Sequence, residues 1–177
     1  LEVDRNNEEI IGLETAGGEL IAFKRDSMQA YYDDGATPYR PITGSKQKYG
    51  LISNSAFTAY ENGLYFVGPD RIIRRLEARA VTDISTPEIG RALEKLGNAG
   101  EAVVFQLDKL IVFTFTADQK TFVFDPVLNA WSTFTTHYSG SQKDFFARCA
   151  TTLPAAAQTN MWLLGCKDGS LNFWDAA

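Results

Sequence analysis

The sequence predicts an all-β protein made of antiparallel meanders, and three observations support this prediction. The stretch 101–136 holds four short apolar runs, rich in Val, Phe, Thr or Trp, with polar or Pro-containing connections of turn length between them. A second unit of four runs occupies about 51–84. Gly-Gly, Asp-Gly and Asn-Gly, which favour tight hairpins, stand between several runs. Recurring four-stranded meanders of this length are typical of the blades of a β-propeller.

Length and composition agree with this fold class. The chain has 177 residues, of which 45% are hydrophobic and 12% aromatic, and it contains 14 glycines. We therefore expect a partial or small propeller of three to four antiparallel four-stranded blades. It is either a single domain over 1–177 or a portion of a larger propeller. No apolar run approaches the roughly 18–20 residues of a membrane helix, so we expect no membrane association.

The first unit reads as a short or incomplete blade. Runs at 10–14, 19–24 and Met28–Tyr32 are separated by the turn signals Ala-Gly-Gly and Arg-Asp-Ser. The segment 35–48 contains two prolines and a glycine among polar residues, and we interpret it as a loop.

The second unit is clearer, and a helix follows it. Strands are expected at 51–60, 64–67, 71–76 and 80–84, with Asn-Gly in the first turn. The periodicity then changes over about 87–96. Thr86 is a plausible N-cap before a proline at the first helical position, and a glycine at 97 ends the pattern.

The last unit lacks a fourth strand. Runs at 145–151, 161–166 and 170–174 follow a polar stretch, 136–143, that we interpret as a loop. The missing strand could come from 10–13 or from residues outside this chain, since added strands remove open sheet edges. Folding this hairpin about residue 156 places Cys149 opposite Leu163 or Leu164 rather than Cys166, so we expect two buried free thiols.

Charge is concentrated at the start of the chain. The net charge is −5, and six carboxylates and one arginine give residues 1–19 the whole of that value. The simplest interpretation is a solvated acidic segment, and the alternative is a face that meets a basic partner or repels DNA. Residues 71–95 carry a net +2, but Arg74 and Arg75 point to opposite sides of a strand. We therefore expect no sequence-specific nucleic-acid binding.

The residue pattern predicts no catalytic, cofactor-binding or metal site. His137 is the only histidine and has no second imidazole at metal-ligand spacing. Several carboxylates fall at predicted turns, where they bond the local backbone. No nucleophile elbow, phosphate loop, dinucleotide fingerprint or Cys-x-x-Cys is present. Carboxylates near a propeller axis still leave a glycosidase open as an alternative.

Three passages carry further motifs. The first, 59–89, has a Gly-x-Asp-Arg turn, an Arg-Leu strand and Ile-Ser-Thr before the predicted helix. The second, 113–132, contains Phe-Thr-Phe, Thr-Phe-Val-Phe-Asp and Asn-Ala-Trp-Ser, and the third, 164–175, contains Lys-Asp-Gly-Ser-Leu and Trp-Asp. Their order and spacing resemble the packaged-DNA stabilisation, or tail hub, proteins of short-tailed bacteriophages. Where that family has a glycine after the Arg-Leu strand, this chain has Ala78-Arg79.

The resemblance implies a structural role in the virion tail. Such proteins form a multi-copy ring, which we expect to be a homo-hexamer, below the portal and adaptor proteins. The ring closes the channel to retain packaged DNA and anchors the tail needle and the fibres or spikes, after assembly in the host cytoplasm. The residues that match the family's blade signature are Gly68, Asp70, Arg71, Ser85, Thr86, Asp125, Trp131, Asp168, Gly169 and Trp174.

Two other function classes stay open. A propeller glycosidase or carbohydrate-binding module would bring aromatic side chains and carboxylates together at one mouth of the ring. A cellular propeller scaffold for protein–protein interaction would share the blade form without the viral setting. We expect a non-enzymatic protein without a cofactor, with Trp131 buried between blades.

Overall fold

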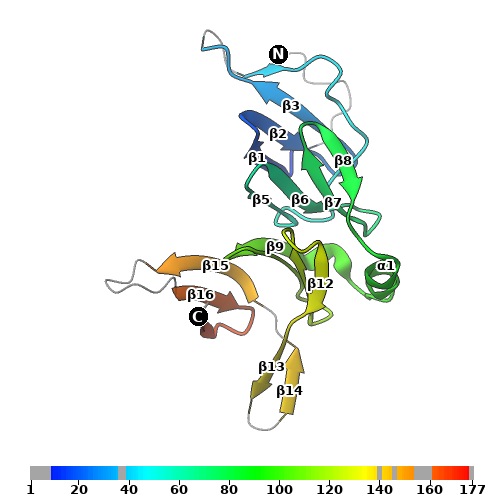
Figure 1. Cartoon of the computed structure of the whole chain (residues 1–177). Coiled ribbons are helices and arrows are strands. Elements are labelled where there is room, and N and C mark those ends of the chain that lie inside the picture. Colours follow the sequence, from blue (N-terminus) through cyan, green and yellow to red (C-terminus); the bar gives the residue numbers. More distant parts are fainter. Residues whose placement is uncertain (1–8, 36–38, 139–140, 145–146, 154–160, 176–177) are drawn as a thin grey trace. The chain divides into compact units, whose positions relative to one another are not determined.

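The protein is an all-β chain of successive antiparallel sheets in a computed structural model (Figure 1). The structure describes residues 9–35, 39–138, 141–144, 147–153 and 161–175. In that part of the chain three sheets have four strands, one has three, and one is a two-stranded hairpin. The chain divides into two compact units, 1–94 and 95–177.

The first unit holds two four-stranded sheets, each a meander in chain order. The strands of the first sheet are β1 (Gly12–Ala16), β2 (Glu19–Phe23), β3 (Met28–Tyr32) and β4 (Arg40–Pro41). Those of the second are β5 (Phe57–Tyr60), β6 (Gly63–Val67), β7 (Ile73–Glu77) and β8 (Ala80–Asp83). Helix α1 (Pro87–Glu94) follows, and it ends two residues before the expected boundary.

An aromatic core joins the two sheets of the first unit. The Phe23 ring of β2 lies 5.3 Å from Phe66 of β6 and 5.8 Å from Phe57 of β5. Phe23, Phe66 and Leu64 are fully buried. All five residues of β6 are buried, so this strand is covered on both faces. The two sheets therefore pack face to face, as in neighbouring layers of a β protein.

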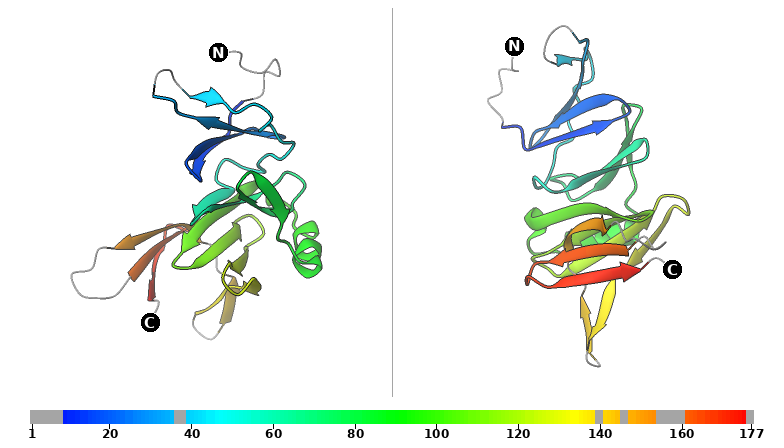
Figure 2. Two further views of the ribbon diagram at one scale, coloured as in Figure 1. Left: turned by 45° about the horizontal axis from the view of Figure 1, so that its top comes forward. Right: turned by 90° about the vertical axis from the view of Figure 1, so that its left-hand side faces the viewer.

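The second unit begins with a complete meander. After the 3₁₀ turn η1 (Ala99–Glu101) come β9 (Ala102–Leu107), β10 (Leu110–Phe115), β11 (Lys120–Asp125) and β12 (Ala130–Thr133). The remaining strands are β13 (Thr135–Tyr138), β14 (Ser141–Asp144), β15 (Ala147–Leu153), β16 (Met161–Cys166) and β17 (Leu171–Asp175). Figure 2 shows the β15–β17 sheet in orange and red beside the green strands of the same unit.

A second core lies between the β9–β12 sheet and the β15–β17 sheet. Leu107, Val112 and Val123 of the former are buried with Leu164 of β16. An ionic contact reinforces this packing, since the Glu101 carboxylate accepts a hydrogen bond from Lys167 Nζ at 2.7 Å. Lys167 first, and then the Thr116 hydroxyl, hold the pKa of Glu101 below its ordinary value.

Two segments expected to be loops contain strands. Within 35–48, β4 pairs with β3, so the first sheet has four strands rather than an incomplete set. The stretch 136–143 is not a loop, because β13 and β14 pair as a hairpin. Both segments have polar sequences without apolar alternation, so the side chains gave no strand signal. Their strands pair through main-chain hydrogen bonds.

Two further expectations about strands are corrected. The run 51–60 is extended over Phe57–Tyr60, after a bent segment. The segment 10–13 does not complete the last sheet, because β1 pairs with β2 instead. Among the described residues the last sheet has three strands, as expected, in the order β15-β16-β17.

The two cysteines are free, as expected, but not buried. Cys149 is exposed and Cys166 half-buried. Cys149 faces Gly165, and a β-bulge between Ala147 and Cys149 shifts the register so that Ala147 faces Cys166. The predicted pairing with Leu163 or Leu164 is wrong because the register from Leu153–Met161 to Cys149–Gly165 is centred one residue later than position 156. No helix of the described residues has the length and apolarity needed to cross a membrane.

Several hairpin turns place non-glycine residues in the left-handed region. At the β7–β8 turn two such residues are consecutive, Ala78 with φ 46° and Arg79 with φ 66°. A two-residue hairpin turn of this kind normally takes Asn-Gly or Gly-Gly, because a Cβ atom is strained at positive φ. The turn therefore carries backbone strain at the two residues from which the Arg79 side chain extends.

Replacing Ala78 by glycine should relieve this strain. We expect Ala78→Gly to raise the free energy of unfolding by about 1 kcal/mol, measured as a shift of the urea midpoint at constant slope. The matched control is Ala80→Gly, on the exposed first residue of β8, where glycine should lower stability by about 0.5–1 kcal/mol. Equal effects of the two substitutions would contradict the assignment of strain to Ala78.

Candidate functional site

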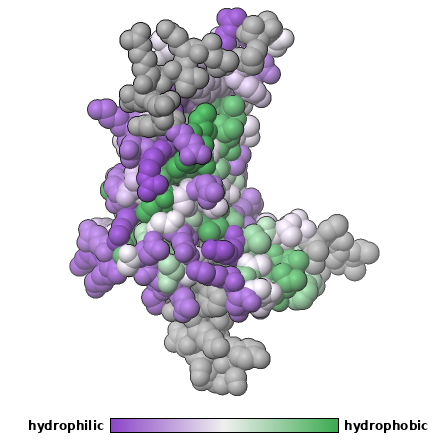
Figure 3. All heavy atoms as spheres, turned by 180° about the vertical axis from the view of Figure 1, so that it is seen from behind, coloured by the Kyte–Doolittle hydropathy of each residue, from purple (hydrophilic) through white to green (hydrophobic). Residues whose placement is uncertain are grey.

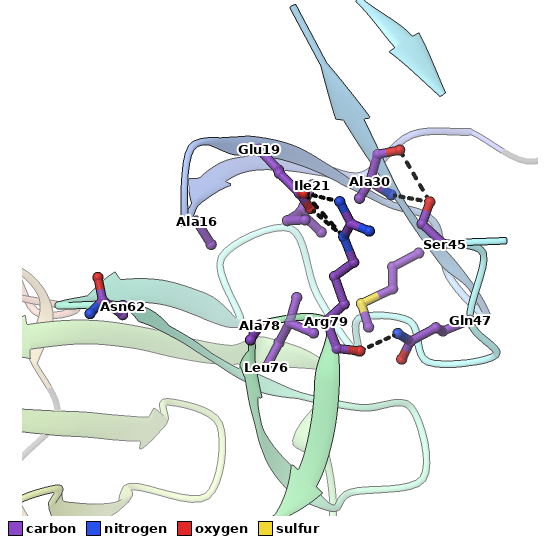
Figure 4. A pocket seen from close by; sticks show the side chains of 12 residues that line it. Ala16, Glu19, Ile21, Ala30, Ser45, Gln47, Asn62, Leu76, Ala78 and Arg79 are labelled. Carbon is purple, nitrogen blue, oxygen red and sulfur yellow. Dashed lines mark hydrogen bonds and ion pairs between the residues drawn. The ribbon is translucent and has the colours of Figure 1, made fainter. Parts of the chain in front are cut away.

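A cavity of about 320 Å³ lies between the two sheets of the first unit (Figure 4). Its apolar wall comes from both sheets, and its polar rim comes from the loops that join their strands. The lining residues are Ala16, Gly17, Glu19, Ile21, Met28, Ala30, Ser45, Gln47, Asn62, Leu76, Ala78 and Arg79. The volume is at the lower end of the range for small-molecule sites.

An ion pair spans the rim of the cavity. Arg79 extends from the strained β7–β8 turn, and its guanidinium bonds the Glu19 carboxylate at the start of β2. Arg79 Nε lies 3.0 and 3.1 Å from the two carboxylate oxygens, so the pair is multidentate. The hydrogen bond from Arg79 holds the pKa of Glu19 below its ordinary value, and Glu19 in turn raises the pKa of Arg79.

Loop side chains fix the rest of the rim. Gln47 donates from Nε2 to the Arg79 carbonyl oxygen at 2.7 Å, which holds the β7–β8 turn against the first sheet. The Ser45 hydroxyl donates to the Ile42 carbonyl at 2.8 Å and accepts from the Ala30 amide at 3.2 Å. The side chains of Glu19, Arg79, Gln47 and Ser45 are thus engaged in hydrogen bonds, and the cavity offers a mainly apolar interior.

The lining of the cavity differs from that of a glycosidase or a sugar-binding site. None of the residues that line it is aromatic, and Glu19 is the one carboxylate among them. A glycosidase needs two carboxylates about the scissile bond, and a sugar platform needs aromatic faces. Across the described residues no group of three or more His, Cys, Asp or Glu side chains is placed to hold a metal ion.

A buried arginine organises the second sheet of the first unit. Arg74 of β7 is 5% exposed, and its guanidinium donates to Asp70 at 2.7 and 2.6 Å and to Asp83 at 2.9 Å. The Tyr49 ring lies 4.9 Å from the guanidinium carbon, in a cation–π arrangement. Gly68 is needed here, because a Cβ atom at that position would lie 2.4 Å from Arg74 Nη1.

The network shifts the pKa values of both partners. The Arg74 hydrogen bonds hold the pKa of Asp70 below its ordinary value, against the opposing effect of burial. Burial by itself would lower the pKa of Arg74, but the two aspartates outweigh it and raise that pKa. The charged forms are therefore the stable ones, which fits a structural ion pair rather than a proton donor.

The neighbouring signature residues fix helix α1. Arg71, at φ 63°, donates from Nη1 to the Leu93 and Glu94 carbonyls at 3.4 and 3.2 Å, where a helix end favours positive charge. At the other end, Thr86 Oγ1 accepts from the Ile89 amide at 3.3 Å, so the predicted N-cap is confirmed. Ser85 Oγ accepts from the Ile73 amide at 2.9 Å.

The signature aspartates of the second unit occupy turns. Asp125 Oδ1 accepts from the Val127 and Leu128 amides at 2.8 and 3.0 Å. Asp168 Oδ1 accepts from the Ser170 amide at 2.9 Å, next to Gly169 at φ 83°. Both are Asx-type turns of the kind predicted from the sequence.

The two signature tryptophans pack on aromatic neighbours. Trp131 lies on the outer strand β12, 4.9 Å from the Phe124 ring and 5.5 Å from Phe113, and is half-buried. The expectation that Trp131 is buried between blades is therefore wrong, because an outer strand leaves one edge of the ring open to solvent. Trp174 stacks on Phe134 at 5.3 Å.

The signature residues of the first unit lie close together, whereas those of the second unit are dispersed. Gly68, Asp70, Arg71, Ser85 and Thr86 surround the β6–β7 turn and helix α1, whereas the others lie in separate turns and strands of the second unit. His137 lies in β13, opposite Gln142.

Sequence reasoning did not find the cavity or the Arg74 network. Glu19 and Arg79 are 60 positions apart, and no motif links them. Arg74 carried a weak signal, because β7 reads Ile-Arg-Arg-Leu-Glu and only the pairing of β7 with β8 brings Asp83 opposite Arg74.

Asp70→Asn should lower the free energy of unfolding by about 1–3 kcal/mol, because Arg74 loses a charged bidentate partner and keeps Asp83. The estimate is reduced from that for a fully buried pair, since the Asp70 side chain is 48% exposed. The control is Asp26→Asn, which removes an exposed carboxylate in the same unit. An equal loss in both variants would contradict the role of Asp70.

The ion pair of Asp70 and Arg74 predicts that the stability of the fold depends on pH. Because the pKa of Asp70 is lowered in the folded state, its contribution is complete above about pH 4 and is lost as the pH falls through the lowered pKa. Urea midpoints of the wild type should therefore decline below about pH 4. Asp70→Asn should decline less over the same range, and identical slopes would exclude this linkage.

Trp131→Ala should cost about 1–3 kcal/mol, less than a core aromatic, because the ring is half-buried. Phe113→Ala, at a fully buried position of the same cluster, should cost about 3–5 kcal/mol. Chemical unfolding of the two variants measures the difference, and the reverse order would show that the Trp131 ring is the central one.

Comparisons with known proteins identify a fold and no family. No family model matches this sequence, and no curated protein sequence matches it significantly. The chain is similar to the computationally designed Ika4 protein, with a TM-score of 0.55 and 13% identity over 97% of this chain and 94% of that one. The computationally designed Ika8 protein gives 0.52 and 14%, over 94% of this chain and 45% of that one. At these identities the likeness concerns the fold alone.

Proposed function

We propose that this chain is a structural protein of the tail of a short-tailed bacteriophage. In this proposal its four larger sheets are blades of a propeller, and six copies form a ring below the portal and adaptor proteins. The ring closes the channel so that packaged DNA is retained, and its outer surface anchors the tail needle and the fibres or spikes. The chain acts by contact, without a catalytic step or a cofactor.

One observation supports a structural role above the others: the signature residues bind groups of their own sheet or helix. Asp70 bonds Arg74, Arg71 bonds the end of α1, and Asp125 bonds amides of its own turn. Such contacts make stiff turns and fixed strand ends. Stiffness is what a wall around packaged DNA requires, and the hydrogen-bonding groups of these residues are engaged in such contacts.

Exposed apolar side chains at turns support contact with other proteins. Val127 and Leu128, at the β11–β12 turn, are 74% and 73% exposed. Two adjacent exposed apolar side chains form a small apolar surface that a protein contact would cover. These two residues are our candidates for a contact with a neighbouring tail component.

The carbohydrate alternative has weaker support. It needs aromatic side chains and carboxylates around one opening, and the cavity of the first unit has one carboxylate, held by Arg79, and no aromatic lining residue. The cellular scaffold alternative is supported equally by the stiff turns and by the exposed apolar pair. It differs from the tail proposal because it predicts no six-fold ring.

Electron microscopy of the purified chain at high concentration tests the proposal. We expect six-fold rings, together with no binding and no hydrolysis on a panel of cell-surface glycans. A chain that forms no ring and binds or cleaves a glycan would contradict the proposal. In that case Glu19→Gln, compared with Asp26→Asn as the control, would show whether the cavity is the sugar site.

A further inference from the structure

The cavity of the first unit is larger than the voids that a packed β core leaves. Its volume is about 320 Å³, whereas voids larger than a water molecule are few in protein interiors. Its wall consists of buried apolar side chains from both sheets, each 3–5% exposed: Ile21, Met28, Ala30 and Leu76. Water gains few hydrogen bonds from a wall of this kind. The space therefore suits the apolar part of a ligand.

One end of the Arg79 guanidinium remains available at the rim of this cavity. Glu19 occupies the edge formed by Nε and Nη2. Among the residues that the structure describes, none bonds Arg79 Nη1. Figure 4 shows the Arg79 side chain reaching toward Glu19 beside the other residues that line the cavity. The Nη1 end can therefore donate hydrogen bonds to an anion while Glu19 stays in place.

Arg74 shows that one guanidinium of this chain can hold two carboxylates. Its Nε donates to Asp83, while Nη1 and Nη2 both donate to Asp70. Arg79 has the first type of contact, with Glu19, and within the described part of the chain it lacks the second. A guanidinium end favours a carboxylate, because its two parallel N–H groups match the two oxygens. The available end of Arg79 thus indicates a ligand that carries a carboxylate.

The backbone of the β7–β8 turn gives a second, independent indication of a binding site. Ala78 and Arg79 both line the cavity, and both have positive φ, at 46° and 66°. Glycine would adopt this conformation without strain. Strained non-glycine residues are concentrated at ligand-binding and active sites, where the surrounding structure holds them. Gln47 does so here through its hydrogen bond to the Arg79 carbonyl oxygen.

We propose that this cavity binds a small apolar carboxylic acid. The carboxylate of the ligand lies at the Nη1–Nη2 end of Arg79, and its hydrocarbon part lies against Ile21, Met28 and Leu76. Glu19 keeps the Nε edge and holds the guanidinium at the rim. Both oxygens of Glu19 already bond Arg79, so the cation is the charged group that the rim offers to a ligand.

This binding site goes beyond the proposed tail function and does not rest on it. Ring formation is observed on assemblies of the chain, whereas acid binding is observed at one cavity inside the first unit. Either result can fail while the other stands.

NMR of the full chain with labelled methionine methyl groups tests the site. The sequence has two methionines, Met28 in the cavity wall and Met161 in β16, and Met161→Leu assigns their signals. We expect octanoate, below its micelle concentration, to shift the Met28 signal. Across straight-chain acids from butanoate upward, affinity should rise about fourfold for each CH₂ group buried, and the rise should stop when the cavity is filled.

Met161 and a matched alcohol serve as controls. Leu171 and Phe173, in the same sheet as Met161, are 64% and 66% exposed, and Figure 3 shows hydrophobic side chains gathered over this sheet. An acid taken up on exposed apolar surface would therefore shift Met161. The alcohol 1-octanol lacks the carboxylate, and it should bind the cavity at least about tenfold more weakly than octanoate.

Variants of the two rim residues should have opposite effects. Arg79→Gln removes the cation, so it should weaken octanoate binding at least about tenfold and leave octanol binding little changed. Glu19→Gln removes a negative charge close to the bound carboxylate, so it should strengthen octanoate binding severalfold. If the ion pair only held the rim in shape, both variants would weaken the acid and the alcohol alike.

Three results would overturn the proposal. The first is a Met28 signal that no straight-chain acid shifts at millimolar concentration, or that shifts only together with Met161. The second is octanol binding as tight as octanoate binding, since the carboxylate would then have no partner. The third is a Glu19→Gln variant that weakens octanoate binding as much as Arg79→Gln does.

Discussion

The fold depends on central strands that are apolar on both faces. In β6 every residue is buried, and in β10 five of six are, so these strands cannot border solvent on either side. A sheet with such a strand at its centre needs an apolar neighbour on each face. The apolar sequence of these central strands therefore requires that the sheets pack on one another. The aromatic contacts of Phe23 with Phe57 and Phe66 are the local form of this constraint.

Polar contacts at the ends of the strands also hold the elements together. The Arg74 network joins the β6–β7 turn to the end of β8, Arg71 joins the same turn to helix α1, and Glu101 joins two sheets of the second unit. The Arg74 and Glu101 contacts involve partly exposed carboxylates, so their contribution to stability depends on pH and ionic strength more than that of the apolar cores. These contacts set the register and orientation of elements that the cores hold together.

Local patterns predicted most of the strands and missed what depends on distant partners. The turn dipeptides and the apolar alternation were sufficient for the second sheet, for β9–β12 and for the capped helix, because those signals act within a few residues. Strand β4 and the β13–β14 hairpin have no apolar alternation, and their pairing depends on the main chain. The bulge beside Cys149 and the half-exposure of Trp131 depend on the neighbouring strand, which a single sequence does not specify.

The candidate site was the least predictable part. Local signals placed Thr86 at a helix cap and Asp125 and Asp168 in turns, whereas Arg71 lies in a turn rather than in the expected strand and Trp131 is half-buried rather than buried. The cavity, by contrast, combines residues from two sheets whose contact follows from the packing of whole faces. Its rim pair of Glu19 and Arg79 also relies on a turn with two non-glycine residues at positive φ, an exception to the usual turn chemistry.

The meander order of every sheet has a consequence for how the chain folds. In each of the four larger sheets consecutive strands are neighbours, so strand pairing needs the closure of short loops. Proteins rich in contacts between nearby residues fold faster than β-sandwiches with distant pairings. Strand pairing within each sheet is therefore local. Burial of both faces of central strands such as β6 and β10 needs the neighbouring sheet as well, so we expect strand pairing to precede sheet packing as the chain folds.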